Sequence, residues 1–198
     1  AFSDGTSGAD EYRGLVQYNH SNNYLRFLTN ATERMRLDSN GIKLPSGHGI
    51  NFHNYGDGTS VSSNLLDDYE EGTFDPGVQG FSSVSYAIRT GHYTKIGRLV
   101  YVDFYIQFGG STTSDANHIY VTNLPFNIAN TNNLRGGGTT SFYNLSSAVV
   151  DDGNISFYGI QGQDKFATYV GSTPWYCGDG VNQSSKYIIG TFIYTAAS

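Results

Sequence analysis

The strongest constraint on the fold is the strict alternation of apolar and polar side chains along residues 99–108. A repeat of two residues is that of a β-strand with one buried face, whereas a surface helix repeats about every 3.6 residues. One face of this strand would carry only apolar side chains, namely Val100, Val102, Phe104, Ile106 and Phe108. We therefore predict a central strand over residues 99–108, with Val102, Phe104 and Ile106 buried.

Shorter stretches with the same alternation run through most of the chain. They lie at residues 15–18, 24–28, 33–38, 84–88, 93–96, 118–122, 139–145, 155–160, 165–170 and 187–194. Turn-forming Gly, Asn and Asp residues separate them, and no stretch shows the pattern of an amphipathic helix of three turns. The 16 tyrosines also favour strands over helices. We predict an all-β protein.

An acidic stretch divides the chain. Residues 57–75 contain six acidic residues and no basic one: Asp57, Asp67, Asp68, Glu70, Glu71 and Asp75. We predict an N-terminal segment over residues 1–56, an acidic connector over residues 57–75, and a larger C-terminal β domain over residues 76–198. The turn spacing in the last part is that of an antiparallel β-sandwich or jelly-roll-like fold.

The first part has few aliphatic side chains for a core of its own. A segment of about 56 residues is at the size where a lone domain is marginal. A polar loop at residues 19–23 and an Asn40-Gly41 turn predict two hairpins. We expect interwoven hairpins from several chains to share one interior. It would contain Leu15, Leu25, Phe27, Met35, Leu37 and Ile42, with Arg34, Arg36 and Asp38 on the opposite face of residues 33–38.

Composition argues against several classes of function. The net charge of −6 argues against a nucleic-acid surface, which needs clustered Lys and Arg. No run of 18 apolar residues occurs, so we predict no membrane insertion. The single cysteine, Cys177, excludes an internal disulfide and a cage of thiolates around a metal. Because the only methionine is internal, we expect that the chain is a piece of a longer protein.

Catalytic and metal-binding patterns are weak. The acids between residues 67 and 71 could form the carboxylate pair of a glycosidase, but adjacent acids on a linker more commonly form a solvated charge run. Asp151 and Asp152 lack the spacing of a calcium loop and fit a hairpin turn. The five histidines form no HxH or HxxxH pair, so an ion held by one His from each of several chains stays an alternative. We predict no catalytic residue, no metal ion and no cofactor.

Several segments resemble recurring pieces of bacteriophage tail-fibre proteins. Residues 18–21 (YNHS) and 28–41 (LTNATERMRLDSNG) resemble a hairpin followed by the ERMRxDSxG element of fibre shafts. Residues 64–74 (NLLDDYEEGTF) resemble the LDDYEEGTW segment that opens the C-terminal head. Residues 91–97 (GHYTKIG) and 123–126 (NLPF) match the pieces that follow in such heads, in the same order.

This resemblance covers residues 1–128 and implies an assembly and a location. Tail-fibre proteins of this kind are elongated homotrimers that end in a β-rich receptor-binding head. Phe74 stands where the family usually has Trp, which keeps an aromatic side chain at that position. The resemblance implies a homotrimer outside the bacterial cell, on the tail fibre of the virion. Other virion tail proteins would join it through a part that precedes Ala1.

Candidate ligand-binding residues lie in polar, aromatic loops beyond the resemblance. Aromatic faces cover the C–H face of a sugar ring, while Asn and Asp bind its hydroxyls. On this basis the candidates are Tyr143, Asn144, Trp175, Tyr176 and Asp179. The alternative for Trp175 is packing in the core or at a subunit interface. Residues 129–183 carry only Arg135 and Lys165 as bases, so we expect neutral or weakly polar sugars to suit these loops better than phosphate-rich polymers.

Taken together, the sequence predicts a non-enzymatic adhesin. It would attach a phage to its host through a surface glycan, either lipopolysaccharide or capsule, or through an outer-membrane receptor. A purely structural fibre, collar or capsid appendage is the first alternative. A surface-polysaccharide hydrolase is the second.

Overall fold

The computed structural model describes residues 5–51, 65–66, 68–110, 113–114, 117–131, 135–143, 155–170, 173–174 and 186–197. Its described elements are β-strands, apart from one short 3-10 helix, η1 (Gly8–Tyr12). The all-β prediction is confirmed. Within the described ranges, no helix has the length and apolar character needed to cross a membrane. The chain divides into two compact units, Ala1–Asp67 and Asp68–Ser198, which are described separately below.

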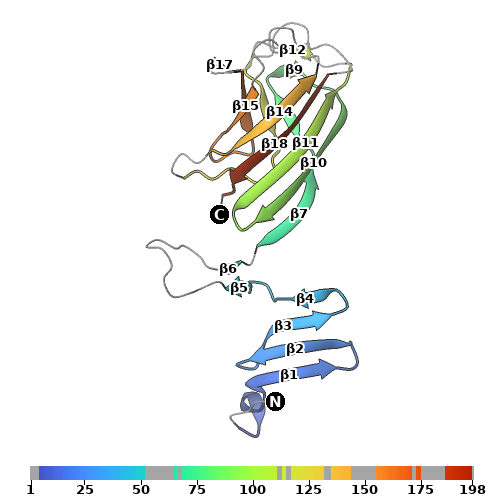
Figure 1. The fold of residues 1–198 in the computed structure, drawn as a ribbon, viewed down its shortest axis with the longest axis vertical. Coiled ribbons are helices and arrows are strands. Elements are labelled where there is room, and N and C mark those ends of the chain that lie inside the picture. Colours follow the sequence, from blue (N-terminus) through green and yellow to red (C-terminus); the bar gives the residue numbers. More distant parts are fainter. Residues whose placement is uncertain are drawn as a thin grey trace. The chain divides into compact units, whose positions relative to one another are not determined.

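The N-terminal unit contains a four-stranded antiparallel sheet in which each strand pairs with the next (Figure 1). Its strands are β1 (Gly14–Asn19), β2 (Tyr24–Thr29), β3 (Thr32–Asp38) and β4 (Gly41–Lys43). The two predicted hairpins are confirmed, and Gly41 has the positive φ of 104° that the Asn40-Gly41 turn requires. Strands β5 (Ile50–Asn51) and β6 (Leu65–Leu66) form a separate pair.

A β-bulge at Arg34 interrupts the predicted alternation in β3. Phe27 pairs with Met35 but Leu28 pairs with Glu33, so Arg34 is the extra residue. The bulge lets Glu33 and Arg36 meet in two hydrogen bonds of 2.9 Å, although they are three residues apart. Glu33 also lies 3.9 Å from Arg26, which is paired directly opposite Arg36. Glu33 therefore offsets the repulsion between two arginines on neighbouring strands.

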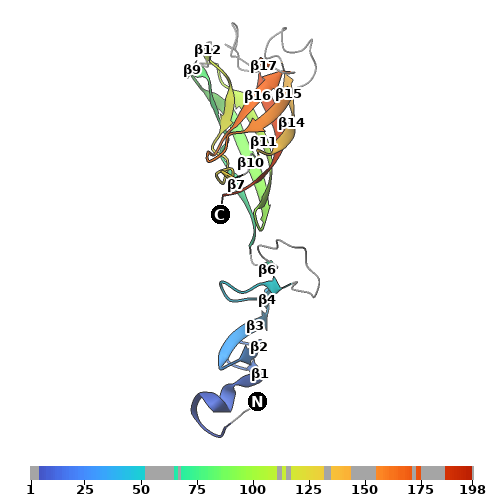
Figure 2. The same ribbon diagram turned by 90° about the vertical axis from the view of Figure 1, so that its left-hand side faces the viewer.

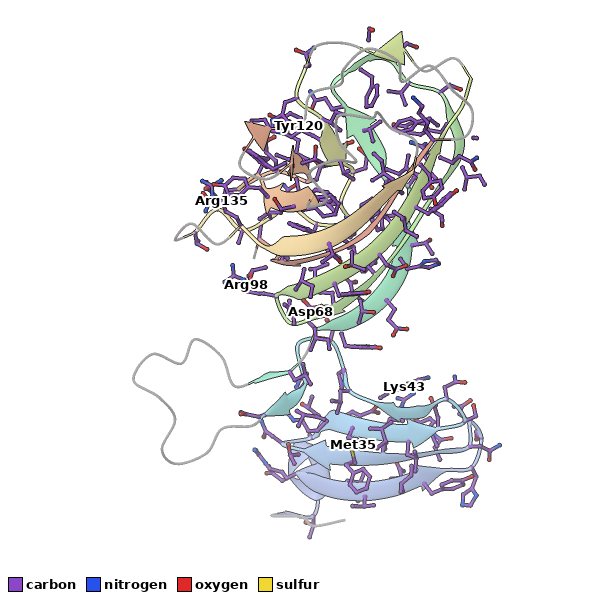
Figure 3. The ribbon with its side chains drawn as sticks, turned by 45° about the horizontal axis from the view of Figure 1, so that its top comes forward. Met35, Lys43, Asp68, Arg98, Tyr120 and Arg135 are labelled. Carbon is purple, nitrogen blue, oxygen red and sulfur yellow. The ribbon has the colours of Figure 1, made fainter. Side chains whose placement is uncertain are left out.

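The register places most of the apolar side chains of this sheet on one face. They are Val16, Tyr18, Leu25, Phe27, Met35, Leu37 and Ile42, and none of them is buried. Met35 is labelled in Figure 3. Five of the six residues predicted to form a shared interior lie on this face. The sixth, Leu15, is paired with Leu28 on the opposite face.

The C-terminal unit is one long antiparallel sheet that curls into a half-barrel (Figures 1 and 2). The strands follow the order β7-β10-β11-β18-β14-β15-β16-β13-β8, and β17 pairs with β16. Their bounds are β7 (Tyr69–Phe74), β8 (Gly77–Gln79), β10 (Tyr86–Ile96), β11 (Leu99–Phe108), β13 (Tyr120–Thr122), β14 (Gly137–Tyr143), β15 (Ile155–Gly159), β16 (Phe166–Val170), β17 (Thr173–Pro174) and β18 (Tyr187–Thr195). A separate pair is formed by β9 (Phe81–Ser83) and β12 (Thr113–Ser114).

The core of this unit lies inside the curl. Strand β11 is an interior strand of the sheet, and Val102, Phe104 and Ile106 are at most 3% exposed, so the prediction for residues 99–108 is confirmed. The neighbouring strand β18 and more distant parts of the sheet complete the core with Ile119, Val121, Phe157, Phe166, Ile188, Phe192 and Tyr194. Burial raises the pKa of the Tyr194 hydroxyl well above its ordinary value, and that hydroxyl donates to the backbone oxygen of Phe126 at 3.1 Å.

Two of the differences from the predicted strands concern β10 and β7. Residues 84–88 and 93–96 were expected as two strands, whereas β10 runs through Gly91 as one strand with an irregular register near Tyr86. Residues 69–74, inside the predicted acidic connector, form strand β7 and pair with β10. The adjacent acids Glu70 and Glu71 are tolerated because β7 is an edge strand of the sheet, where one side remains open to solvent.

The segments that resemble tail fibres contact one another in this unit. Strand β7 pairs with β10 so that the ring of Tyr93 covers Gly72 and the ring of Phe74 covers Gly91. A Cβ atom at Gly72 or Gly91 would lie 2.6 or 2.4 Å from these rings, so only glycine fits. Tyr93 also meets Phe126 of the NLPF segment edge-on, at 5.4 Å between ring centroids.

An ion pair lies beside the turn that connects β10 to β11. Lys95, only 8% exposed, binds Asp68, and its ammonium nitrogen lies 5.2 Å from the centre of the Phe126 ring. The backbone N–H of Gly97 donates to the Asp68 carbonyl. Asp68 is labelled beside this turn in Figure 3. These family-like segments therefore have a structural role in the described fold.

Candidate functional site

The structure describes one of the five residues predicted to bind a ligand. Tyr143 is the last residue of β14, and its backbone is paired with Tyr187 of β18. Asn144, Trp175, Tyr176 and Asp179 lie outside the described residues. The predicted site in these loops therefore stays a prediction. The described residues nevertheless contain a second surface with suitable chemistry, on strands β13, β15 and β16.

The register of three neighbouring strands, β13, β16 and β15, brings the tyrosines of this surface together. Ala167 of β16 is paired with Tyr120 of β13 on one side and with Tyr158 of β15 on the other. The alternate residues Ile119, Val121, Phe157 and Phe166 are buried in the core, so both tyrosines lie on the outward face. Ala167 is only 1% exposed although it lies on that face, whereas Tyr158 is 39% exposed.

Four rings form a continuous chain of contacts across these strands. The His118 ring lies 4.6 Å from the Tyr120 ring and 5.2 Å from the Tyr169 ring, measured between centroids. Tyr169 in turn meets Tyr158 edge-on at 5.9 Å. The Nε2 atom of His118 donates to the Thr168 carbonyl at 2.8 Å, which orients the imidazole.

Two cations flank the rings. The Lys165 nitrogen lies 4.7 Å from the centre of the Tyr120 ring and donates to Gln79 Oε1 at 3.1 Å. The Arg135 guanidinium lies 4.6 Å from the centre of the Tyr158 ring. Figure 3 labels Tyr120 and Arg135 on the same side of the unit. We call the set of Tyr120, Tyr158, Tyr169, His118, Lys165 and Arg135 the tyrosine surface.

A hollow of about 440 Å³ opens at one edge of the tyrosine surface. Its lining combines rings with amides: Gln79, Gly80, Phe81, Asn117, His118 and Tyr120. Gly80 has a φ of 103°, and a Cβ there would lie 2.4 Å from the His118 carbonyl. A side chain at this position would therefore clash with the wall of the hollow.

A second hollow, of about 360 Å³, lies on the outward face of the other half of the sheet. It is lined by Thr90, His92, Asp103, Phe104, Tyr105, Thr139, Ile189, Gly190 and Thr191. His92 Nδ1 lies 3.5 Å from Asp103 Oδ2, and both side chains are at least half exposed. The hydroxyls of Thr139 and Thr191 are 3.2 Å apart. Tyr105 is the one tyrosine among its lining residues, whereas the tyrosine surface contains three tyrosines.

Two of the acids considered for a carboxylate pair have other partners in the structure. Asp68 is held by Lys95, and Glu71 accepts a hydrogen bond of 2.5 Å from the Tyr69 hydroxyl. This hydrogen bond raises the pKa of Tyr69. Asp67, Asp151 and Asp152 lie outside the described residues. The part of the chain that the structure describes holds no group of three or more His, Cys, Asp or Glu side chains that could bind a metal ion.

The sequence analysis did not predict the tyrosine surface, although the alternation around its tyrosines shows which way they point. Alternation places Tyr120 opposite Ile119 and Val121, and Tyr158 opposite Phe157. Their outward direction could thus have been read from the sequence. What the alternation does not contain is the pairing of β13 and β15 with β16, because pairing joins residues far apart in the chain.

No family model, no curated protein and no solved structure matches the chain. The resemblance to tail-fibre proteins thus depends on the quoted segments alone. Function is inferred below from these segments and from the geometry of the two units.

Proposed function

We propose that the chain is the distal part of a bacteriophage tail fibre, a homotrimer whose C-terminal unit attaches the virion to the bacterial surface. It would bind a surface glycan and do no chemistry on it. The observation that carries this proposal is the tyrosine surface, in which three outward tyrosines and a histidine form one chain of ring contacts flanked by two cations.

Sugar binding by such a surface follows from its two kinds of group. The tyrosine ring faces can cover the apolar C–H face of a sugar, and their hydroxyls can exchange hydrogen bonds with its hydroxyls. Gln79 and Asn117, in the adjoining hollow, add amide groups. Tyrosine loses little conformational entropy on binding, because its side chain has two torsions. Weak binding at each head would be multiplied by the several heads of a virion.

The homotrimer is supported by the N-terminal sheet. Seven apolar side chains lie on one face and none of them is buried, with Ile42 68% exposed. Full burial of a large apolar side chain stabilises a fold by roughly 1.5–3 kcal/mol. We propose that the same faces of neighbouring chains cover one another in an interwoven shaft. The half-barrel of the C-terminal unit would be the sandwich-like head.

The proposal is tested with the whole chain and variants of the tyrosine surface. Light scattering should give three chain masses. The parent should adsorb to some members of a panel of bacterial cells. Tyr158→Ala and Tyr169→Ala should remain folded and lose roughly tenfold in adsorption, since an aromatic contact contributes about 0.5–1.5 kcal/mol and several heads bind together. The matched control is Tyr101→Ala, because Tyr101 is 41% exposed but lies on β11.

Each other outcome contradicts a named part of the proposal. A single chain mass would exclude the homotrimer. Folded tyrosine variants that adsorb as well as the parent would exclude the tyrosine surface as the adhesive site. Adsorption to no cell would favour a structural appendage, and release of reducing ends from surface polysaccharide would show a hydrolase.

A further inference from the structure

The tyrosine surface has a local charge opposite to that of the chain. The chain has 17 acidic and 11 basic residues. Arg135 and Lys165 are the only basic residues between positions 129 and 183, and the fold brings both to this surface although they are 30 positions apart in sequence. Within the described ranges, neither forms an ion pair with a carboxylate of the chain.

Both cations are held in position before any ligand arrives. Each lies over the face of a tyrosine ring, and Lys165 also donates to Gln79. A cation over a ring keeps its charge and most of its hydrogen-bond donors, so it can still bind an anion. Because little side-chain freedom is left to lose, binding an anion costs less conformational entropy.

We infer that the tyrosine surface takes an acidic glycan whose sugar units carry carboxylates, an inference that rests on the proposed function. Tyr120 and Tyr158 belong to strands on either side of β16, which places them about 10 Å apart at twice the spacing of neighbouring strands. Sugar rings would lie on the tyrosines, with their carboxylates toward Lys165 and Arg135. Neutral sugars, which the loop composition had suggested, would give neither cation an anionic partner.

A carboxylate fits better than a doubly charged phosphate monoester for a geometric reason. Phosphate sites bring several donors to one point, as a helix N-terminus or an arginine cluster does. Here the two cations lie over different rings on different strands, so each can hold one singly charged group. Such an arrangement matches a polymer with one carboxylate on each sugar unit.

The test compares two polymers that share a sugar backbone and differ in whether the carboxylates are free or methylated. The whole chain is titrated with polygalacturonate and with its methyl ester, and alginate and hyaluronan serve as further carboxylated polymers. We expect binding to at least one carboxylated polymer, weakening as salt rises. The methyl ester should bind at least tenfold more weakly than polygalacturonate. Polyphosphate is included as the phosphate-bearing competitor.

Variants assign the effect to the two cations. Arg135→Gln and Lys165→Gln should each weaken binding of the carboxylated polymer by on the order of tenfold, as expected when a charge-assisted hydrogen bond is lost. The control is Arg89→Gln, because the Arg89 guanidinium also lies over a tyrosine, Tyr86, at 4.9 Å but belongs to β10. It should bind like the parent.

Failure of this inference differs from failure of the proposed function. If polygalacturonate and its methyl ester bind equally, and Tyr158→Ala abolishes the binding of both polymers, the site is a glycan site but not one for acidic glycans. Binding to none of the carboxylated polymers, or tighter binding of polyphosphate, would likewise overturn the inference. If binding of the acid is unaffected by the tyrosine and cation variants alike, the proposed adhesive site is wrong as well.

Discussion

Replacing Phe104 with alanine should destabilise the C-terminal unit more than a typical core truncation. Phe104 is 3% exposed and contacts the rings of Phe157 and Phe166, at 6.0 and 5.8 Å between centroids. Its two cross-strand partners are Gly91 and Gly190, which have no side chain to move into the space. The cavity left by the substitution should therefore stay open.

The size of that cavity sets the expected loss in the free energy of unfolding. Phe→Ala in a core costs about 3–5 kcal/mol, and a site that cannot collapse lies at the upper end of that range. For a unit of this size, about 4 kcal/mol corresponds to a melting temperature lowered by roughly 12–16 °C. The control is Gln107→Ala, on the outward face of the same strand, which should cost roughly 1 kcal/mol or less.

The assay is urea unfolding of each variant, with calorimetry as a second measurement. Because the total stability of a domain is about 5–15 kcal/mol, Phe104→Ala alone can leave the unit largely unfolded. Phe104→Leu then keeps the test decisive, since it retains most of the volume and should lose less than half as much stability. Equal losses for Phe104→Ala and Gln107→Ala would mean that the assignment of inner and outer faces is wrong.

Two further predictions concern glycine fit and pH. Gly91→Ala should lower the free energy of unfolding by about 1–3 kcal/mol, because its Cβ would lie 2.4 Å from the Phe74 ring. Gly137→Ala has open space around its Cβ and should be nearly neutral in the same unfolding assay. Equal effects of the two variants would contradict the packing of the Phe74 ring on Gly91. Hydrogen bonds from Arg36 lower the pKa of Glu33 below its ordinary 4.5, so its contribution to the N-terminal sheet is present above pH 4.5 and is lost as the pH falls through the lowered pKa. Acid unfolding followed by the Met35 methyl signal should therefore depend less on pH in Glu33→Gln, and an unchanged profile would refute the role of this pair.

Local pattern was enough to predict strand β11 and its buried face, but not the irregularities of the sheets. The alternation over residues 99–108 specifies a strand and its buried face, because side-chain direction in a strand depends only on the two-residue repeat. The bulge at Arg34 breaks this repeat in β3 and brings Glu33 to Arg36. Nothing in residues 33–38 marks it, since its position depends on the register with β2.

For the candidate site, the alternation within each strand is enough to predict which side chains point outward, whereas the pairing between strands places them next to one another. Tyr120, Tyr158 and Tyr169 are each placed outward by their own strand. They form one surface only because β13 and β15 both pair with β16. Lys165, just before β16, and Arg135, just before β14, lie over two of the tyrosine rings. Such contacts join residues tens of positions apart, and their register is set by the burial of whole sheet faces, which no local stretch of sequence contains.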